Sequence, residues 1–181
     1  GKQFLIGFLV GFVILLLLGW AVYGNFFVVK DIQLNITNPL AGLKILSSDD
    51  GEVLIETDNY TGELAIDEIE ITPEFITYLL GLIEAQNYLH KIPLTNNVPI
   101  INFEIGDKSF NAVVDRGVEA YEGLSDSADL KFDISQEVVV LTTVADDPKD
   151  EFLSAVDSGE VQIEMLVGET ELFSKGYLGF Y

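Results

Sequence analysis

The stretch ADLKFDISQE at residues 128–137 decides which fold this chain adopts. Apolar and polar residues alternate from Asp129 to Ile134, as expected for a strand with one buried face. Ser135 could then cap a helix, but residues 138–143 read VVVLTT, and β-branched side chains lower helix propensity. The segment after Ile134 is therefore predicted either as a helix that Ser135 caps or as a further strand.

Residues 152–164 read FLSAVDSGEVQIE, the pattern of a helix that ends at a glycine and continues into a strand. Asp147 and Pro148 predict the start of this helix and Gly159 its end, because these residue types are favoured at those positions. The elements expected after it are a strand over 160–167, a helical turn over 169–174 and a terminal strand over 177–181.

Two hairpins are predicted in the preceding sequence. Apolar and polar residues alternate over 101–114 around a turn at Gly106-Asp107. The segments 43–47 and 52–57 flank Asp50-Gly51, a pair that supplies positive φ in tight hairpin turns. We expect antiparallel pairing in both places.

One long helix is predicted between these hairpins. A strand over 63–71 leads to Thr72 and Pro73, which are typical of an N-cap and a first helical position. Apolar residues at three-to-four spacing extend the helix over 73–89.

The predicted domain organisation has its boundary in a loop rich in Asn and Pro at 93–99. A strand-rich region over 31–97 contains the long helix, and residues 98–181 form a mixed strand and helix domain. The fold class of this soluble part is α+β.

With these features, residues 98–181 resemble the sterol-carrier family of nonspecific lipid-transfer domains. The two quoted segments carry the resemblance, which differs from the family in the Val-rich 138–144 and in the turn and strand beyond 167. The family implies an apolar tunnel between sheet and helices. Six inward apolar side chains could line such a tunnel, but core filling is the favoured interpretation, because aromatic residues fill cores far more often than they line cavities. They are Phe103, Phe110, Phe132, Leu141, Phe152 and Val156.

The N-terminal stretch FLIGFLVGFVILLLLGWAVY, residues 4–23, contains no charge. Twenty residues at ~1.5 Å each span about 30 Å as a helix, the thickness of a bilayer core. We therefore expect a single transmembrane helix over 1–24, followed by a short tether over 25–30. Gly7 and Gly11 form a GxxxG pair, which favours a helix-helix contact in lipid, although the spacing also arises by chance.

The orientation follows from a few residues. Lys2 precedes the apolar stretch, and Asn35 and Asn59 lie in acceptor patterns for N-glycosylation. The expected arrangement is single-pass, with the N-terminus cytoplasmic and the soluble domain extracytoplasmic.

Charge and composition exclude several function classes. The chain has 30 acids against 9 bases and a net charge of -21, which disfavours binding to nucleic acid. It has no Cys and one His, His90, so a thiol nucleophile or a multi-His metal site cannot form in one chain. Solvated loops and helix caps account for acidic pairs such as Asp126 and Asp129. No enzyme activity, metal or cofactor is expected.

Three function hypotheses remain open. The first is a non-enzymatic accessory subunit of a larger membrane assembly, which docks through its acidic domain and associates through the Gly7 and Gly11 face. The second is a membrane-tethered protein that binds a lipid or isoprenoid. The third is a filament subunit of the pilin kind, in which the apolar helix packs in a bundle.

Overall fold

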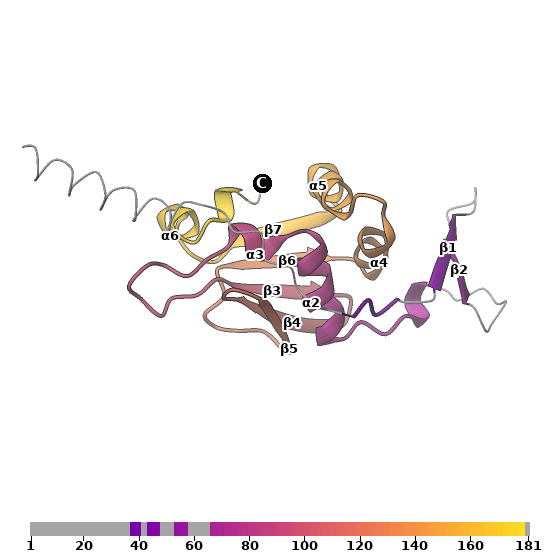
Figure 1. Cartoon of the computed structure of the whole chain (residues 1–181), viewed down its shortest axis with the longest axis horizontal. Helices are drawn as coiled ribbons and strands as arrows, with labels where there is room; N and C mark the ends of the chain where they lie inside the picture. The colour runs from indigo at the N-terminus through magenta and orange to yellow at the C-terminus, as the bar shows by residue number, and fades with distance from the viewer. Residues whose placement is uncertain (1–36, 41–42, 48–52, 58–65, 180–181) are drawn as a thin grey trace, which may run out of the picture. The chain divides into compact units, whose positions relative to one another are not determined.

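Five strands form the main sheet of the domain (Figure 1). The computed structural model describes residues 37–40, 43–47, 53–57 and 66–179, which all belong to one unit over residues 32–181. The sheet is built from strands β3 (Ile100–Ile105), β4 (Lys108–Val114), β5 (Val118–Glu122), β6 (Leu130–Ile134) and β7 (Val161–Met165).

The strand order in this sheet is β5-β4-β3-β6-β7. Strands β3 and β6 are parallel, with Phe103 opposite Phe132, and the other neighbours are antiparallel. The hairpin predicted over 101–114 is confirmed as β3 and β4. The connection from β5 to β6 is tied to the sheet because Asn102 Nδ2 donates to the Ser125 carbonyl at 3.0 Å and Asn111 Nδ2 to the Gly123 carbonyl at 3.0 Å.

A separate pair of strands precedes the main sheet. Strands β1 (Leu43–Ser47) and β2 (Val53–Thr57) are antiparallel, with Leu43 opposite Thr57 and Ser47 opposite Val53. This confirms the predicted pairing, and the Asp50-Gly51 turn itself lies outside the described residues.

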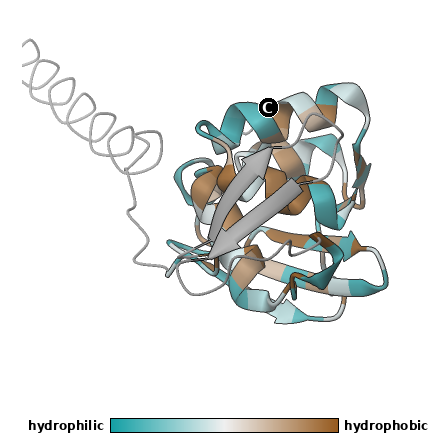
Figure 2. Cartoon of the chain, turned by 90° about the vertical axis from the view of Figure 1, so that its right-hand side faces the viewer, coloured by the Kyte–Doolittle hydropathy of each residue, from teal (hydrophilic) through white to brown (hydrophobic). Residues whose placement is uncertain are grey.

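Helices pack against the apolar face of the main sheet, and hydrophobic stretches gather toward the interior of the domain (Figure 2). One core draws residues from both sides of the predicted boundary at 97, from Leu40 to Tyr177. The helical elements are η1 (Ile66–Glu68), α2 (Pro73–Leu82), α3 (Ala85–Tyr88), α4 (Gln136–Val144), α5 (Pro148–Ser158), α6 (Glu169–Ser174) and η2 (Tyr177–Gly179).

The segment after Ile134 is helix α4, so the strand alternative is wrong. Ser135 Oγ accepts from the Val138 N–H at 3.2 Å and forms the N-cap. Five side chains of α4 are buried, and the free energy of burying them outweighs the low helix propensity of Val and Thr. They are Val138, Val139, Val140, Thr142 and Thr143.

The two N-caps predicted at Pro-containing starts are confirmed. Thr72 Oγ1 accepts from the Phe75 N–H at 3.4 Å, and Asp147 Oδ1 accepts from the Asp150 N–H at 3.1 Å. Helix α5 ends at Gly159, whose φ of 82° lies in the left-handed region that glycine adopts without strain. Strand β7 and helix α6 follow as expected.

The long helix predicted over 73–89 is interrupted. Helix α2 ends at Leu82, and Glu84, at φ 60°, separates it from the single turn of α3. A non-glycine residue in the left-handed region cannot continue a right-handed helix.

Two strand predictions are wrong in the described residues. Residues 66–68 form the 3₁₀ turn η1, and residues 69–71 are not part of a strand. Gln136 Nε2 donates to the carbonyls of Ile66 and Ile69, both at 2.7 Å, so a side chain satisfies these two carbonyls and not a neighbouring strand. The predicted terminal strand begins instead with the 3₁₀ turn η2, since Tyr177 points into the core and is 1% exposed.

The predicted α+β class is confirmed, but the predicted transmembrane helix is not supported. Within the described ranges, no helix is long and apolar enough to cross a membrane. The longest helix there, α5, has 11 residues, whereas a bilayer core requires about 20. The segment 1–24 and the tether 25–30 lie outside the described residues.

Candidate functional site

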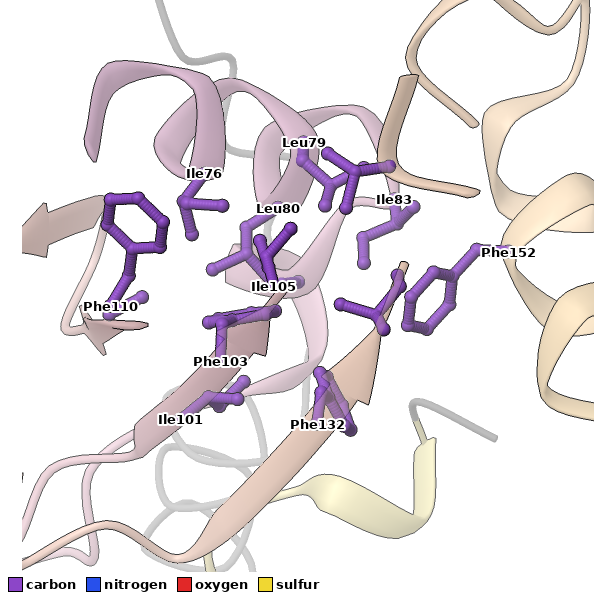
Figure 3. Packing of buried hydrophobic residues seen from close by; sticks show 14 of the residues in the cluster. Ile76, Leu79, Leu80, Ile83, Ile101, Phe103, Ile105, Phe110, Phe132 and Phe152 are labelled. Atoms are coloured by element: carbon purple, nitrogen blue, oxygen red, sulfur yellow. The ribbon is translucent and has the colours of Figure 1, made fainter. Parts of the chain in front are cut away.

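An aromatic cluster lies on the face of the sheet that the helices cover (Figure 3). Phe103 and Phe132 meet edge to face with ring centroids 5.3 Å apart, and Phe132 and Phe152 lie 5.8 Å apart at 59°. Such geometries are favourable beyond the area that they bury. The cluster joins β3, β6 and α5 into one apolar layer.

Helix α2 supplies the aliphatic part of this layer. Ile76, Leu79, Leu80 and Ile83 are each at most 1% exposed, and Figure 3 shows them between the helix and the strands. The spacing of Ile76, Leu79 and Leu80 places them on one face of α2, as the sequence predicted, and Ile83 follows at the C-cap.

The residues predicted to line a tunnel fall into two groups. Phe103, Phe110, Phe132 and Phe152 are buried in the apolar layer. Leu141 and Val156 are half-buried on α4 and α5. A lining role for these six residues remains a prediction.

Helix α4 places a polar atom inside this apolar surrounding. The hydroxyl of Thr143 donates to the Val139 carbonyl at 2.7 Å. Thr142 is fully buried, and within the described part of the chain its Oγ1 has no hydrogen-bond partner. Burying a hydroxyl without a hydrogen-bond partner costs about 1–3 kcal/mol. A ligand, a water molecule or a change of conformation would remove this cost by supplying a partner.

A second buried group lies at the start of β6. Asp129, fully buried, accepts hydrogen bonds from Lys175 Nζ, from the Tyr177 hydroxyl at 2.9 Å and from the Ile100 N–H at 2.9 Å. Lys175 is 1% exposed and lies 3.2 Å from Glu171 Oε1. These contacts hold the C-terminal elements α6 and η2 against the end of the sheet at which β3 and β6 begin.

The electrostatics of this cluster are those of a structural anchor. Burial, the adjacent Asp129 charge and the hydrogen bond to it raise the pKa of the Tyr177 hydroxyl far above its ordinary range, so it stays a donor. Hydrogen bonds from Asn97 and Lys175 hold the pKa of Glu171 below its ordinary value. Each of Asp129, Lys175, Tyr177 and Glu171 thus has at least one hydrogen-bond partner, as buried polar networks require.

Asp129 was expected to be solvated, and this expectation is wrong. Its position before a buried strand resembles that of an ordinary loop acid, and its partners Lys175 and Tyr177 lie 46 and 48 residues away in sequence. The pattern of neighbouring residues contains no sign of such a contact.

The other sequence-predicted positions are placed as follows. Gly7, Gly11, Asn35 and Asn59 lie outside the described residues. In the ranges that the structure describes, no three His, Asp or Glu side chains are arranged to hold a metal ion. His90 follows α3 and its side chain is exposed. Its backbone N–H donates to the Lys175 carbonyl at 3.0 Å.

Comparison with known proteins finds similar solved structures but no similar sequence. No protein family matches the sequence, and no curated protein is similar to it. Among solved structures, the chain is similar to a UbiJ-SCP2 ubiquinone synthesis protein with a TM-score of 0.36 and 16% identity, over 58% of this chain and 88% of that one.

Two further neighbours come from Aedes aegypti. A palmitated SCP2L2, solved by solution NMR, has a TM-score of 0.35 and 11% identity over 59% of this chain and 94% of that one. A crystal structure of sterol carrier protein 2 like 2 has a TM-score of 0.31 and 17% identity over 56% and 88%. The neighbours are sterol-carrier domains, the family that residues 98–181 resemble, and at these TM-scores the likeness carries no conclusion about a ligand.

Proposed function

We propose that the domain binds an apolar, lipid-like molecule with an uncharged polar head between the sheet and helices α2, α4 and α5, without catalysing a reaction. The observation that carries the proposal is the Thr142 hydroxyl, a buried polar atom that has no hydrogen-bond partner among the described residues. A single hydroxyl or carbonyl on the ligand would satisfy it.

The composition of the interior favours this class of ligand. The layer around Phe103, Phe132 and Phe152 is aromatic and aliphatic, so it suits a hydrocarbon body. Within the described residues, Lys175 is the one buried cation, and it is already paired with Asp129. A buried carboxylate head would therefore lack a counter-charge, which makes an alcohol or a ketone the better match.

Helix α4 supports entry of such a molecule. Its nine residues include six β-branched side chains, so the isolated helix is unstable and depends on its buried contacts. A ligand that replaces those contacts would let α4 shift away from α2, α5 and η1 at little cost. This makes α4 the moving wall of the proposed site.

The test is native mass spectrometry of the full chain after delipidation, with hexadecanol and palmitic acid as probes. We expect one hexadecanol per chain and weaker binding of palmitate. Replacing Thr142 by Val keeps the shape and removes the hydroxyl, so hexadecanol should bind about fivefold more weakly, the value of roughly 1 kcal/mol for one hydrogen bond.

The matched control is Thr143→Val, because the Thr143 hydroxyl is already bonded to Val139. Hexadecanol affinity should not change in this variant. Binding that is absent in the folded wild type, or that falls equally in both variants, would sink the proposal.

The accessory-subunit and pilin-like hypotheses depended on residues 1–24. These residues lie outside the described part of the chain, and no described contact favours either hypothesis over lipid binding.

A further inference from the structure

We infer that one end of the domain docks on the surface of a phospholipid bilayer. This end, called the apolar end, carries the exposed side chains of Leu94, Phe173 and Leu178. Leu94 lies in the loop before β3, and the other two lie in α6 and η2. Their exposed fractions are 102%, 66% and 64%, which is high for such large hydrophobic residues.

The three side chains belong to elements at the same end of the sheet, where β3 and β6 begin (Figure 1). Asn97 Nδ2 donates to Glu171 Oε1 at 2.6 Å and ties the loop over 91–97 to α6. The Gly176 N–H donates to the Phe173 carbonyl at 3.1 Å and continues α6 into η2. The apolar end is thus built from parts that are bonded to one another.

The backbone conformation of the loop keeps the Leu94 side chain exposed to solvent. Its φ of 65° lies in the left-handed region, which disfavours a branched side chain such as Leu. Thr95 Oγ1 donates to the Ile92 carbonyl at 2.8 Å and accepts from the Asn97 N–H at 3.1 Å, and the Ile92 N–H donates to the Asn97 carbonyl at 3.0 Å. A strained and fully exposed leucine on a hydrogen-bonded loop contributes nothing to the core, which points to a contact outside the domain.

Charge identifies that contact as a lipid surface. The 19 residues from Ala85 to Phe103 contain no acid. The acids of α6 at this end are Glu169, which is exposed, and Glu171, which is paired with Asn97 and Lys175. His90 and Lys91 lie at the base of the loop, at the depth where headgroup phosphates would meet them if Leu94 entered the acyl boundary. The acidic remainder repels strongly anionic membranes, so a zwitterionic surface fits best.

This docking goes beyond the proposed function and does not require a bound ligand. It gives the lipid-binding domain a place to exchange its cargo, but it depends on Leu94, Phe173 and Leu178 and not on Thr142. The two proposals can therefore fail separately.

The test uses the full chain, which contains no Cys, so a single introduced thiol takes a label cleanly. Leu94→Cys carries an environment-sensitive NBD fluorophore, and phosphatidylcholine vesicles are added. We expect a blue shift and at least a twofold rise in emission as the label leaves water. Because the label reports only its own surroundings, apolar residues elsewhere in the chain do not produce this signal.

The matched control places the same label at Asp107→Cys, an exposed position in the β3–β4 turn at the opposite end of the sheet. That label should not respond to vesicles. No change at position 94, or an equal change at both positions, would overturn the inference.

A second variant addresses the rest of the apolar end. Phe173→Ser with Leu178→Ser, in the Leu94 label background, should raise the vesicle concentration needed for half the response by about tenfold. Thr142→Val should leave the response unchanged. An unshifted midpoint in the folded double variant would count against docking through this end.

Discussion

Replacing Asp129 by Asn should destabilise the domain more than any change to its surface charges. The substitution keeps the size of the side chain and one acceptor oxygen but removes the charge that Lys175 faces. Both residues are 1% exposed or less at their side chains, so water cannot take the place of the lost partner. Glu171, 3.2 Å from Lys175 and partly exposed, compensates only in part.

The expected size follows from this burial. Breaking a buried pair by removing one partner costs about 3–5 kcal/mol, because the remaining charge is left without compensation. We expect about 3 kcal/mol for Asp129→Asn, since the amide can still accept from the Ile100 N–H or the Tyr177 hydroxyl. That is a large share of the ~5–15 kcal/mol by which a domain is usually stable.

The assay is urea unfolding of the full chain followed by circular dichroism, together with amide hydrogen exchange. The His90 and Leu166 N–H groups, which donate to the Lys175 and Asp129 carbonyls, should exchange faster in the variant. The surface control is Lys131→Met. Lys131 bridges Glu104 at 3.3 Å and Glu164 at 2.9 Å in an exposed setting, so its loss should change the free energy of unfolding little.

A double-mutant cycle gives the decisive comparison. Lys175→Met alone should also destabilise, but added to Asp129→Asn it should cost much less than in the wild type, because no unpaired charge remains. A loss below about 1 kcal/mol for Asp129→Asn, or strict additivity of the two changes, would refute the view of this pair as a buried anchor.

Three further outcomes are expected. Gly176→Ala should unfold the C-terminal segment, because the added Cβ would lie 2.1 Å from the Tyr88 carbonyl oxygen. Gly159→Ala is the control, since Gly159 has a similar φ and its added Cβ would meet no atom within 4 Å. The control should lower the free energy of unfolding by only about 1 kcal/mol, measured by thermal unfolding. Tyr177→Phe should lose about 1–3 kcal/mol in urea unfolding, since it removes a buried hydrogen bond to a charged group. Glu171 has a lowered pKa in the folded state, so its contribution to stability is complete above its usual pKa of about 4.3 and is lost as pH falls through the lower folded value. Glu171→Gln should therefore make stability less dependent on pH below about 4.3, and an unchanged acid unfolding profile would count against this.

Local pattern predicted much of the secondary structure. Alternation over 101–114 and 129–134 gave the correct strands, and the residues at Thr72, Asp147 and Gly159 gave the correct helix ends. These features depend on neighbours within about four residues, and the sequence displays those neighbours directly.

Local pattern left α4 undecided and misplaced two strands. The β-branched residues of α4 prefer strands, yet the helix forms because its side chains are buried between other elements. In the same way, Gln136 occupies the carbonyls of Ile66 and Ile69, where a strand was expected.

The sequence by itself determined the α+β class, the hairpin over 101–114, the strand over 129–134, the helix that starts after Asp147 and many apolar residues of the core, because these follow from periodicity and from local capping. Only the tertiary structure decided that Asp129 is a buried anchor, that Thr142 lacks a partner and that Leu94 is held exposed. The first two depend on residues far apart in the chain, whose burial and pairing arise only when the sheet and the helices have packed together. The loop of Leu94 is closed by bonds between near neighbours over 92–97, and the bond from Asn97 to Glu171 ties it to α6.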